Sequence, residues 1–177
     1  MKHTSYVYVS HLNYHNSSMV ITILKALMKK DLQALISEKG IQMVHYITDR
    51  PFSQYHNRLM SDAVANHKEF FGIEARWKYF ESGHGKGPCD GIVGSVKRMA
   101  EQAGKHGTPM ADADDFFKWA SETGGAVNYT WIGQEEYDLS QKEVNMLQAQ
   151  IAAVKGTGML HAVRSGSDAP HGLWRAT

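Results

Sequence analysis

An alternation of strand-like and helix-like patterns near the start of the sequence constrains the fold more than any other feature. Residues 6–10 alternate aromatic and β-branched side chains, as strands do. Residues 19–39 carry apolar side chains at helical spacing, and Gly40 then supplies a glycine stop. Residues 41–48 are mostly apolar, which predicts a strand buried on both faces. This order predicts a β-α-β unit with two parallel strands, and therefore an α/β fold.

The same alternation continues along the rest of the sequence. Ser17 or Ser18 is expected to cap the first helix. Because the sequence has no obvious linker, we expect one α/β domain over residues 1–164, and a loosely ordered tail over residues 165–177. The patterns predict further helices over residues 54–71, 92–102, 112–122 and 134–154, and further strands over residues 75–80, 127–132 and 158–164.

The charge and cysteine content restrict the environment and the partners. The 19 basic and 18 acidic residues nearly cancel, so any attraction to nucleic acid must come from a local surface. A single cysteine, Cys89, cannot form an internal disulfide, which is typical of a reducing compartment. The sequence has no apolar run of about 18 residues and no secretory pattern at its start. We therefore expect an intracellular protein, nuclear or cytoplasmic, that is not embedded in a membrane.

A glycine-rich segment between a predicted strand and a predicted helix is the most distinctive part of the sequence. Residues 81–91 read Glu-Ser-Gly-His-Gly-Lys-Gly-Pro-Cys-Asp-Gly and are called the corner below. The corner does not match a nucleotide-binding P-loop, because the spacing differs and no Ser or Thr follows Lys86. We interpret it as a strand-to-helix turn built around His84 and Asp90.

Two aspartates follow predicted strands, where α/β folds place their ligand sites. Asp49 comes after the strand over residues 41–48, and Asp90 comes after the strand over residues 75–80. Two carboxylates held together bind hard cations such as Mg²⁺ or Mn²⁺, and His84 could complete the ligands or transfer a proton. The alternative is structural, because an aspartate after a strand is more often a turn former or a helix cap.

Four segments of the sequence resemble a group of transposon-derived eukaryotic proteins. The most specific match is Ser82-Gly-His-Gly-Lys-Gly-Pro-Cys-Asp-Gly-Ile-Val-Gly-Ser-Val-Lys-Arg98. The supporting matches are Tyr46-Ile-Thr-Asp-Arg-Pro-Phe-Ser-Gln-Tyr-His-Asn-Arg58, Trp77-Lys-Tyr-Phe80 and Gly156-Thr-Gly-Met-Leu-His161. This group has ribonuclease H-like transposase or integrase domains of the DDE/DDD type, and the resemblance extends over nearly the whole chain.

The resemblance implies a fold, a reaction and roles for particular residues. The fold would be a ribonuclease H-like mixed sheet flanked by helices, and the reaction would be DNA strand cleavage or transfer with Mg²⁺ or Mn²⁺. Asp49 and Asp90 would be two of the metal-binding acids, with His84 and Lys86 beside the second. Lys97 and Arg98 would face the phosphate backbone of DNA. For this last pair the alternative is an ordinary solvated helix face.

The sequence also departs from the pattern of the group. The group has an upstream strand with an Asp-Phe-x-Glu-Asn element that this sequence lacks, so the resemblance implies an N-terminally truncated domain. An acid that the group has after its third strand is His11 here, and Arg50 and His56 replace a glycine and a lysine. A sheet without its first strands exposes an edge, which a second copy or a partner chain would cover.

The residues leave three hypotheses about function open. The first is a transposase-derived domain of metal-dependent DNA cleavage or transfer, whose present activity is left open because two acids are too few for two metal ions. The second is a non-enzymatic module that binds nucleic acid or protein. The third is a metal-dependent nuclease with an unusual set of ligands: His11, Asp49, His84 and Asp90.

Overall fold

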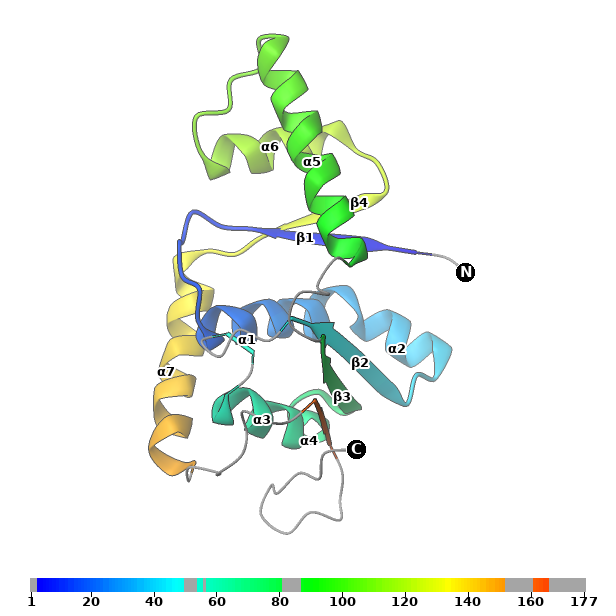
Figure 1. Cartoon of the computed structure of the whole chain (residues 1–177), viewed down its shortest axis with the longest axis vertical. Helices are drawn as coiled ribbons and strands as arrows, with labels where there is room; N and C mark the ends of the chain where they lie inside the picture. The colour runs from blue at the N-terminus through cyan, green and yellow to red at the C-terminus, as the bar shows by residue number, and fades with distance from the viewer. Residues whose placement is uncertain (1–2, 50–53, 56, 81–86, 152–160, 166–177) are drawn as a thin grey trace. The chain divides into compact units, whose positions relative to one another are not determined.

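The chain has an α/β fold that divides into two compact units. A computed structural model describes residues 3–49, 54–55, 57–80, 87–151 and 161–165. Unit 1 comprises Met1–Asn13 and Lys86–Glu136, and unit 2 comprises Tyr14–Gly85 and Tyr137–Thr177 (Figure 1). Each unit has its own small sheet. The expectation of one domain over residues 1–164 stays a prediction.

Unit 1 is a pair of parallel strands with two helices on one side. Strand β1 (Ser5–Val9) pairs in parallel with β4 (Val127–Trp131). Helices α5 (Pro88–Lys105) and α6 (Ala113–Thr123) lie on the same side of this pair (Figure 1). Aromatic side chains of α6 pack against β4, with ring centroids 6.3 Å apart for Phe116 and Tyr129 and 5.5 Å apart for Phe117 and Trp131. This aromatic layer anchors α6 to the sheet.

Unit 2 is built on a mixed sheet of three strands. Strand β2 (Met43–Thr48) pairs in parallel with β3 (Glu74–Tyr79), and β5 (Ala162–Arg164) pairs with β3 in the antiparallel direction. The middle strand carries the largest core residue, because Trp77 is only 2 % exposed. Trp77 packs within a cluster that includes Leu24, Met28, Met60 and Val64. The sheet therefore supports a core contributed by the helices around it.

The first helical segment of unit 2 contains a π turn. Helix α1 (Ser17–Ala26) continues into a π-helical turn, η1 (Leu27–Asp31), and then into α2 (Gln33–Lys39). The Leu32 N–H donates to the Leu27 carbonyl oxygen at 2.9 Å, a bond that skips one residue more than an α-helical bond does. The segment ends at Gly40, whose φ of 60° is the left-handed conformation of a helix stop. The predicted stop is confirmed.

The remaining helices of unit 2 differ in part from the sequence prediction. One helix was expected over residues 54–71, and the structure has α3 (Arg58–Ala65) and α4 (His67–Phe71), separated at Asn66. The last helix, α7 (Gln134–Gln150), begins within unit 1 and belongs to unit 2 from Tyr137 onward. Residues 152–154, at the predicted end of this helix, lie outside the described residues.

Two expectations about the strands are wrong. The strands over residues 6–10 and 41–48 were expected to pair with each other, but β1 pairs with β4 and β2 pairs with β3. Strand β2 was expected to be buried on both faces, whereas Ile47 is 56 % exposed and His45 is exposed too. An apolar run therefore belongs here to a strand with one open face.

The predicted tail begins in ordered structure. Ser165 is 1 % exposed, and its hydroxyl accepts a hydrogen bond from the Ala75 N–H at 2.7 Å. The expectation of a loosely held residue is therefore wrong for Ser165, and residues 166–177 lie outside the described residues.

None of the described helices is both long enough and apolar enough to cross a membrane.

Candidate functional site

Asp49 lies where two parallel strands end side by side. Thr48 of β2 is in register with Tyr79 of β3, and the Phe80 N–H donates to the Thr48 carbonyl oxygen at 2.8 Å. Asp49 follows this last rung of the ladder and is exposed. Phe80, the last described residue before the corner, lies at the same edge of the sheet, and residues 81–86, including the predicted His84 and Lys86, lie outside the described residues. The carboxyl-end placement expected for Asp49 is thus present.

Thr48 connects this edge to the buried core of unit 2. Its hydroxyl accepts a hydrogen bond from the indole N–H of Trp77 at 2.9 Å. The same hydroxyl donates to the carbonyl oxygen of Asp49 at 2.9 Å. Because Trp77 is fixed in the core, these two bonds hold the backbone of Asp49 in place while its carboxylate stays open to solvent.

Asp90 lies in the first turn of α5, where it caps the helix. Its carboxylate accepts a hydrogen bond from the Gly87 N–H at 2.8 Å. This contact is half of a capping box, since glycine has no side chain to return the bond. A negative charge in the first turn is also favourable to the helix dipole. The structural alternative for Asp90 is therefore realised, and α5 begins at Pro88 rather than near Ile92.

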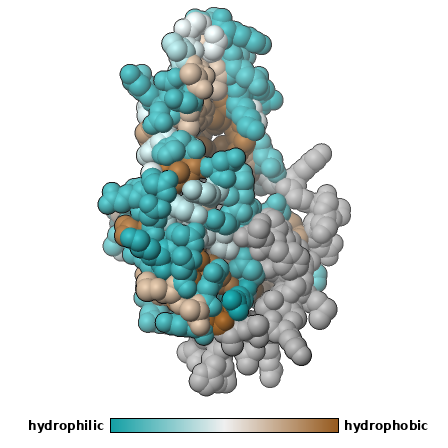
Figure 2. All heavy atoms as spheres, turned by 90° about the vertical axis from the view of Figure 1, so that its left-hand side faces the viewer, coloured by the Kyte–Doolittle hydropathy of each residue, from teal (hydrophilic) through white to brown (hydrophobic). Residues whose placement is uncertain are grey.

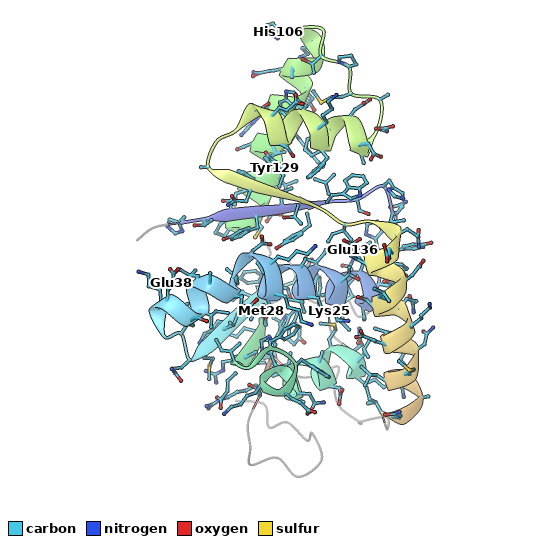
Figure 3. All side chains as sticks on the ribbon, turned by 180° about the vertical axis from the view of Figure 1, so that it is seen from behind. Lys25, Met28, Glu38, His106, Tyr129 and Glu136 are labelled. Atoms are coloured by element: carbon cyan, nitrogen blue, oxygen red, sulfur yellow. The ribbon has the colours of Figure 1, made fainter. Side chains whose placement is uncertain are left out.

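Lys97 and Arg98 lie side by side on the exposed surface of α5. Val96 before them is buried at 7 % exposure and anchors the helix, whereas Lys97 and Arg98 are both exposed. The Nη2 group of Arg98 donates to the Ser95 hydroxyl at 3.3 Å, and that hydroxyl donates to the Gly91 carbonyl oxygen at 2.8 Å. Arg98 thereby points along α5 toward the N-terminal end of the helix. The helix ends at Lys105, followed by His106 (Figure 3).

The predicted histidine and carboxylate ligands that the structure describes are divided between the two units. His11 belongs to unit 1, where its ring lies 5.6 Å from that of Trp131, and His15 belongs to unit 2. Asp90 is in unit 1, whereas Asp49 is in unit 2. Across residues 3–49, 54–55, 57–80, 87–151 and 161–165, no three side chains of His, Cys, Asp or Glu come together as a metal site would need.

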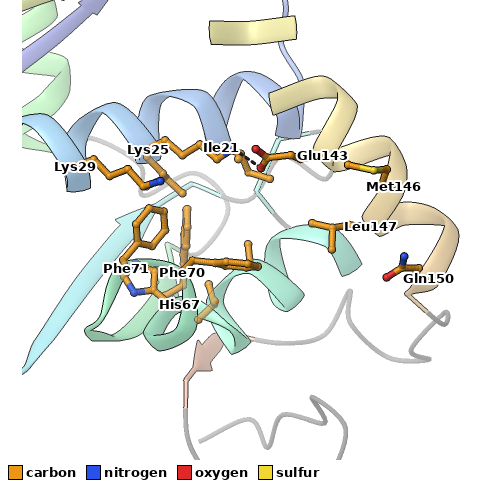
Figure 4. Close-up of a pocket in the computed structure, with 14 residues that line it drawn as sticks. Ile21, Lys25, Lys29, His67, Phe70, Phe71, Glu143, Met146, Leu147 and Gln150 are labelled. Carbon is orange, nitrogen blue, oxygen red and sulfur yellow. Dashed lines mark hydrogen bonds and ion pairs between the residues drawn. The ribbon is translucent and has the colours of Figure 1, made fainter. Parts of the chain in front are cut away.

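A pocket in unit 2 is the feature that the sequence did not predict. It has a volume of about 510 Å³ and opens between the α1–η1 segment, α4 and α7, with Trp77 of β3 among the residues that line it (Figure 4). Lys25 and Glu143 form an ion pair at its rim. No sequence signal separates these apolar residues from ordinary core residues, because both occupy the inward face of a helix.

His67 lies beside this pocket with both ring nitrogens engaged. Nδ1 lies 2.7 Å from the carbonyl oxygen of Ile73, and Nε2 lies 2.8 Å from the hydroxyl of Tyr46. Burial lowers the pKa of His67 below its ordinary value, and the hydrogen bond with Ile73 opposes this in part. Burial likewise raises the pKa of Tyr46 above its ordinary value. Both groups are therefore neutral at neutral pH.

Comparison with known proteins identifies a family but no activity. The model of a domain of unknown function, DUF8701, matches residues 1–169, a range that contains every helix and strand described above. No curated protein and no solved structure matches the chain.

Proposed function

Because the chain belongs to the DUF8701 family, whose description names no activity, its own residues must indicate the function, and we propose a transposase-derived domain that binds DNA. The proposed fold is the ribonuclease H-like sheet that the sequence resemblance implies. The mixed sheet of unit 2 supports it, because β2 and β3 are parallel and β5 is antiparallel.

The observation that carries the proposal is the exposed pair Lys97 and Arg98 on α5. Adjacent cations on a rigid helix suit contacts to the phosphate backbone, which supply most of the affinity of sequence-independent binding. The Ser95 contact holds the guanidinium of Arg98 in one direction and so reduces the entropy lost on binding. Lys86, which lies outside the described residues, stays a predicted contact of the same kind.

The metal chemistry implied by the resemblance does not fit the described residues. Two-metal cleavage of a phosphodiester needs roughly three or four convergent carboxylates. Of the two predicted acids, Asp90 already accepts a hydrogen bond from the Gly87 N–H, and the described residues offer no cluster of three ligands. We therefore propose binding of DNA as the present function of this chain.

A second chain at the sheet edge forms part of the same proposal. In the three-stranded sheet of unit 2, β2 is an edge strand with Ile47 exposed on one face. Edge strands of this kind pair readily with another chain. We propose a second copy at this edge, which sedimentation of the purified chain would detect as a dimer.

The test of DNA binding compares two double variants by fluorescence anisotropy with a labelled duplex. Removing two phosphate contacts in Lys97→Ala with Arg98→Ala should reduce the slope of log affinity against log salt by about 2. The matched control is Lys105→Ala with Lys118→Ala, which removes the same charge from two exposed lysines of the same unit. Equal losses in both double variants, or no binding by the original chain, would show the proposal to be wrong.

A further inference from the structure

The pocket of unit 2 has the dimensions and lining of a small-molecule site. Its volume of about 510 Å³ falls within the range of roughly 300–1,000 Å³ typical of such sites. Its lining is mostly apolar and comes from several elements, namely the α1–η1 segment, α3, α4, β3 and α7. The lining includes residues of the fixed core, because Trp77 and Val64 are 2 % and 1 % exposed. A groove for a partner helix would instead run along the surface between two helices.

The pocket carries a positive charge at its rim. The rim ammonium of Lys25 is paired with the carboxylate of Glu143, as the dashed line in Figure 4 shows. Lys29 follows one turn later and also lines the pocket, and within the part of the chain that the structure describes it has no ion pair. His67, the other titratable lining residue, is neutral because burial lowers its pKa. The charges of Lys25 and Glu143 cancel, so the lining has a net charge of one positive unit, which comes from Lys29.

Lys29 lies at this rim within the π turn. Lys29 belongs to η1, where the helix widens by one residue per turn. π turns are rare, and they occur frequently at functional sites. The turn thus marks Lys29 by a backbone feature that is independent of the pocket volume.

Apolar side chains beside the pocket are left open to solvent. Phe70 is 46 % exposed and Met146 is 60 % exposed, and both line the pocket. Figure 2, which faces α7, shows a surface that is mostly hydrophilic with separate hydrophobic spots. A ligand with an apolar body would cover Phe70 and Met146 and remove their surface from water.

From this combination we propose that the pocket binds a small organic acid with an apolar body and one carboxylate. The apolar body fills the space between Trp77, Phe70 and Met146, and the carboxylate pairs with the ammonium of Lys29. This site is separate from the proposed DNA-binding surface of α5, because its lining lies entirely in unit 2. Its failure would leave the proposed function untouched.

The test uses decanoate as the probe, with calorimetry on the full chain. Decanoate should bind about tenfold more tightly than decan-1-ol, because the alcohol lacks the charge that pairs with Lys29. Along a series of shorter fatty acids the affinity should fall about fourfold for each methylene removed. Binding that is as tight for acetate as for decanoate would overturn the proposal.

Two variants locate the probe, and each has a matched control. Lys29→Met should weaken decanoate about tenfold and leave decan-1-ol unchanged, whereas Lys39→Met, at an exposed lysine of α2, should change neither. Met146→Glu should weaken decanoate by repulsion at the rim, whereas Leu139→Glu on the same helix should not. All four positions are at least partly open to solvent, so folding is preserved. Equal effects of a variant and its control would overturn the proposal.

Discussion

The hydroxyl of Tyr46 lies 2.8 Å from Nε2 of His67 in the core of unit 2. On the other side of the ring, Nδ1 lies 2.7 Å from a carbonyl oxygen, that of Ile73. Since a carbonyl oxygen only accepts, Nδ1 carries the proton, and Nε2 accepts from the tyrosine hydroxyl. The core of unit 2 thus holds a neutral imidazole in one tautomer.

This arrangement predicts that mild acid destabilises the protein through His67. The folded-state pKa of His67 is lowered by burial, so the unfolded chain binds its proton first as the pH falls. The stabilising contribution is therefore full above about pH 6.5 and is lost as the pH falls below it. Thermal unfolding measured between about pH 7.5 and about pH 5 should show the melting temperature falling with pH.

The control for this prediction is an exposed histidine of the same unit. His67→Gln should flatten the dependence of the melting temperature on pH and lower stability at neutral pH. His45→Gln, at an exposed position of β2, should keep the original dependence. If His67→Gln retained the full dependence, His67 would not be its source.

Asp90 is predicted to contribute to folding as a helix cap. Asp90→Ala leaves the Gly87 N–H without its partner and should lower the free energy of unfolding by about 1 kcal/mol. Asp90→Asn keeps an oxygen acceptor and should lose less. Urea unfolding measures both, and Asp49→Ala, an exposed aspartate without this bond, is the control. An unchanged midpoint for Asp90→Ala would contradict the capping role.

Divalent manganese is predicted to leave the melting temperature of the chain unchanged. A ligand that binds the folded state alone raises stability with its concentration, so a metal site would be visible as a rise in melting temperature. The measurement is a thermal melt with and without millimolar MnCl₂ on the original chain, Asp49→Asn and Asp90→Asn. A rise that both variants abolish would restore the metal-site hypothesis and contradict the prediction.

Two glycine-to-alanine changes are predicted to have opposite signs. Gly94 lies inside α5 with open space where a Cβ would be placed, so Gly94→Ala should stabilise by about 0.5–1 kcal/mol. Gly40 also has open space, but its φ of 60° is unfavourable for alanine. Gly40→Ala should therefore destabilise by about 1 kcal/mol. Urea unfolding of both variants checks the pair, and equal signs would contradict the conformational argument.

Local signals in the sequence predicted where helices and strands occur better than they predicted which elements pair in space. Gly40 was found because a left-handed helix stop needs no tertiary information. The cap of the first helix was assigned to Ser17 or Ser18, but Asn16 accepts the Met19 N–H. Strand pairing was predicted wrongly, because β1 takes a partner more than a hundred positions away, as in the register of Val7 with Tyr129. Nothing in residues 6–10 encodes that choice.

The positions of some candidate residues along the fold were predicted, and their functional roles stay predictions. Asp49 does follow β2 at the carboxyl edge, and Lys97 is exposed on α5 as expected. The role of Asp90 depended on where α5 begins, and Pro88 allowed the helix to start four positions before the predicted Ile92. The pocket beside Trp77 could not be predicted, because a cavity depends on how helices are spaced rather than on their composition.

The π turn over Leu27–Asp31 is the place where the first helical segment of unit 2 could lose one residue without a change in the direction of its apolar face. Deleting one residue there would restore regular α-helical bonding, so Leu24 before the turn and Ile36 after it would keep facing the core. Deleting one residue in the middle of α1 would instead rotate everything that follows by about 100°. The extra residue of the π turn is thus not needed to keep the apolar residues on either side of it in the core.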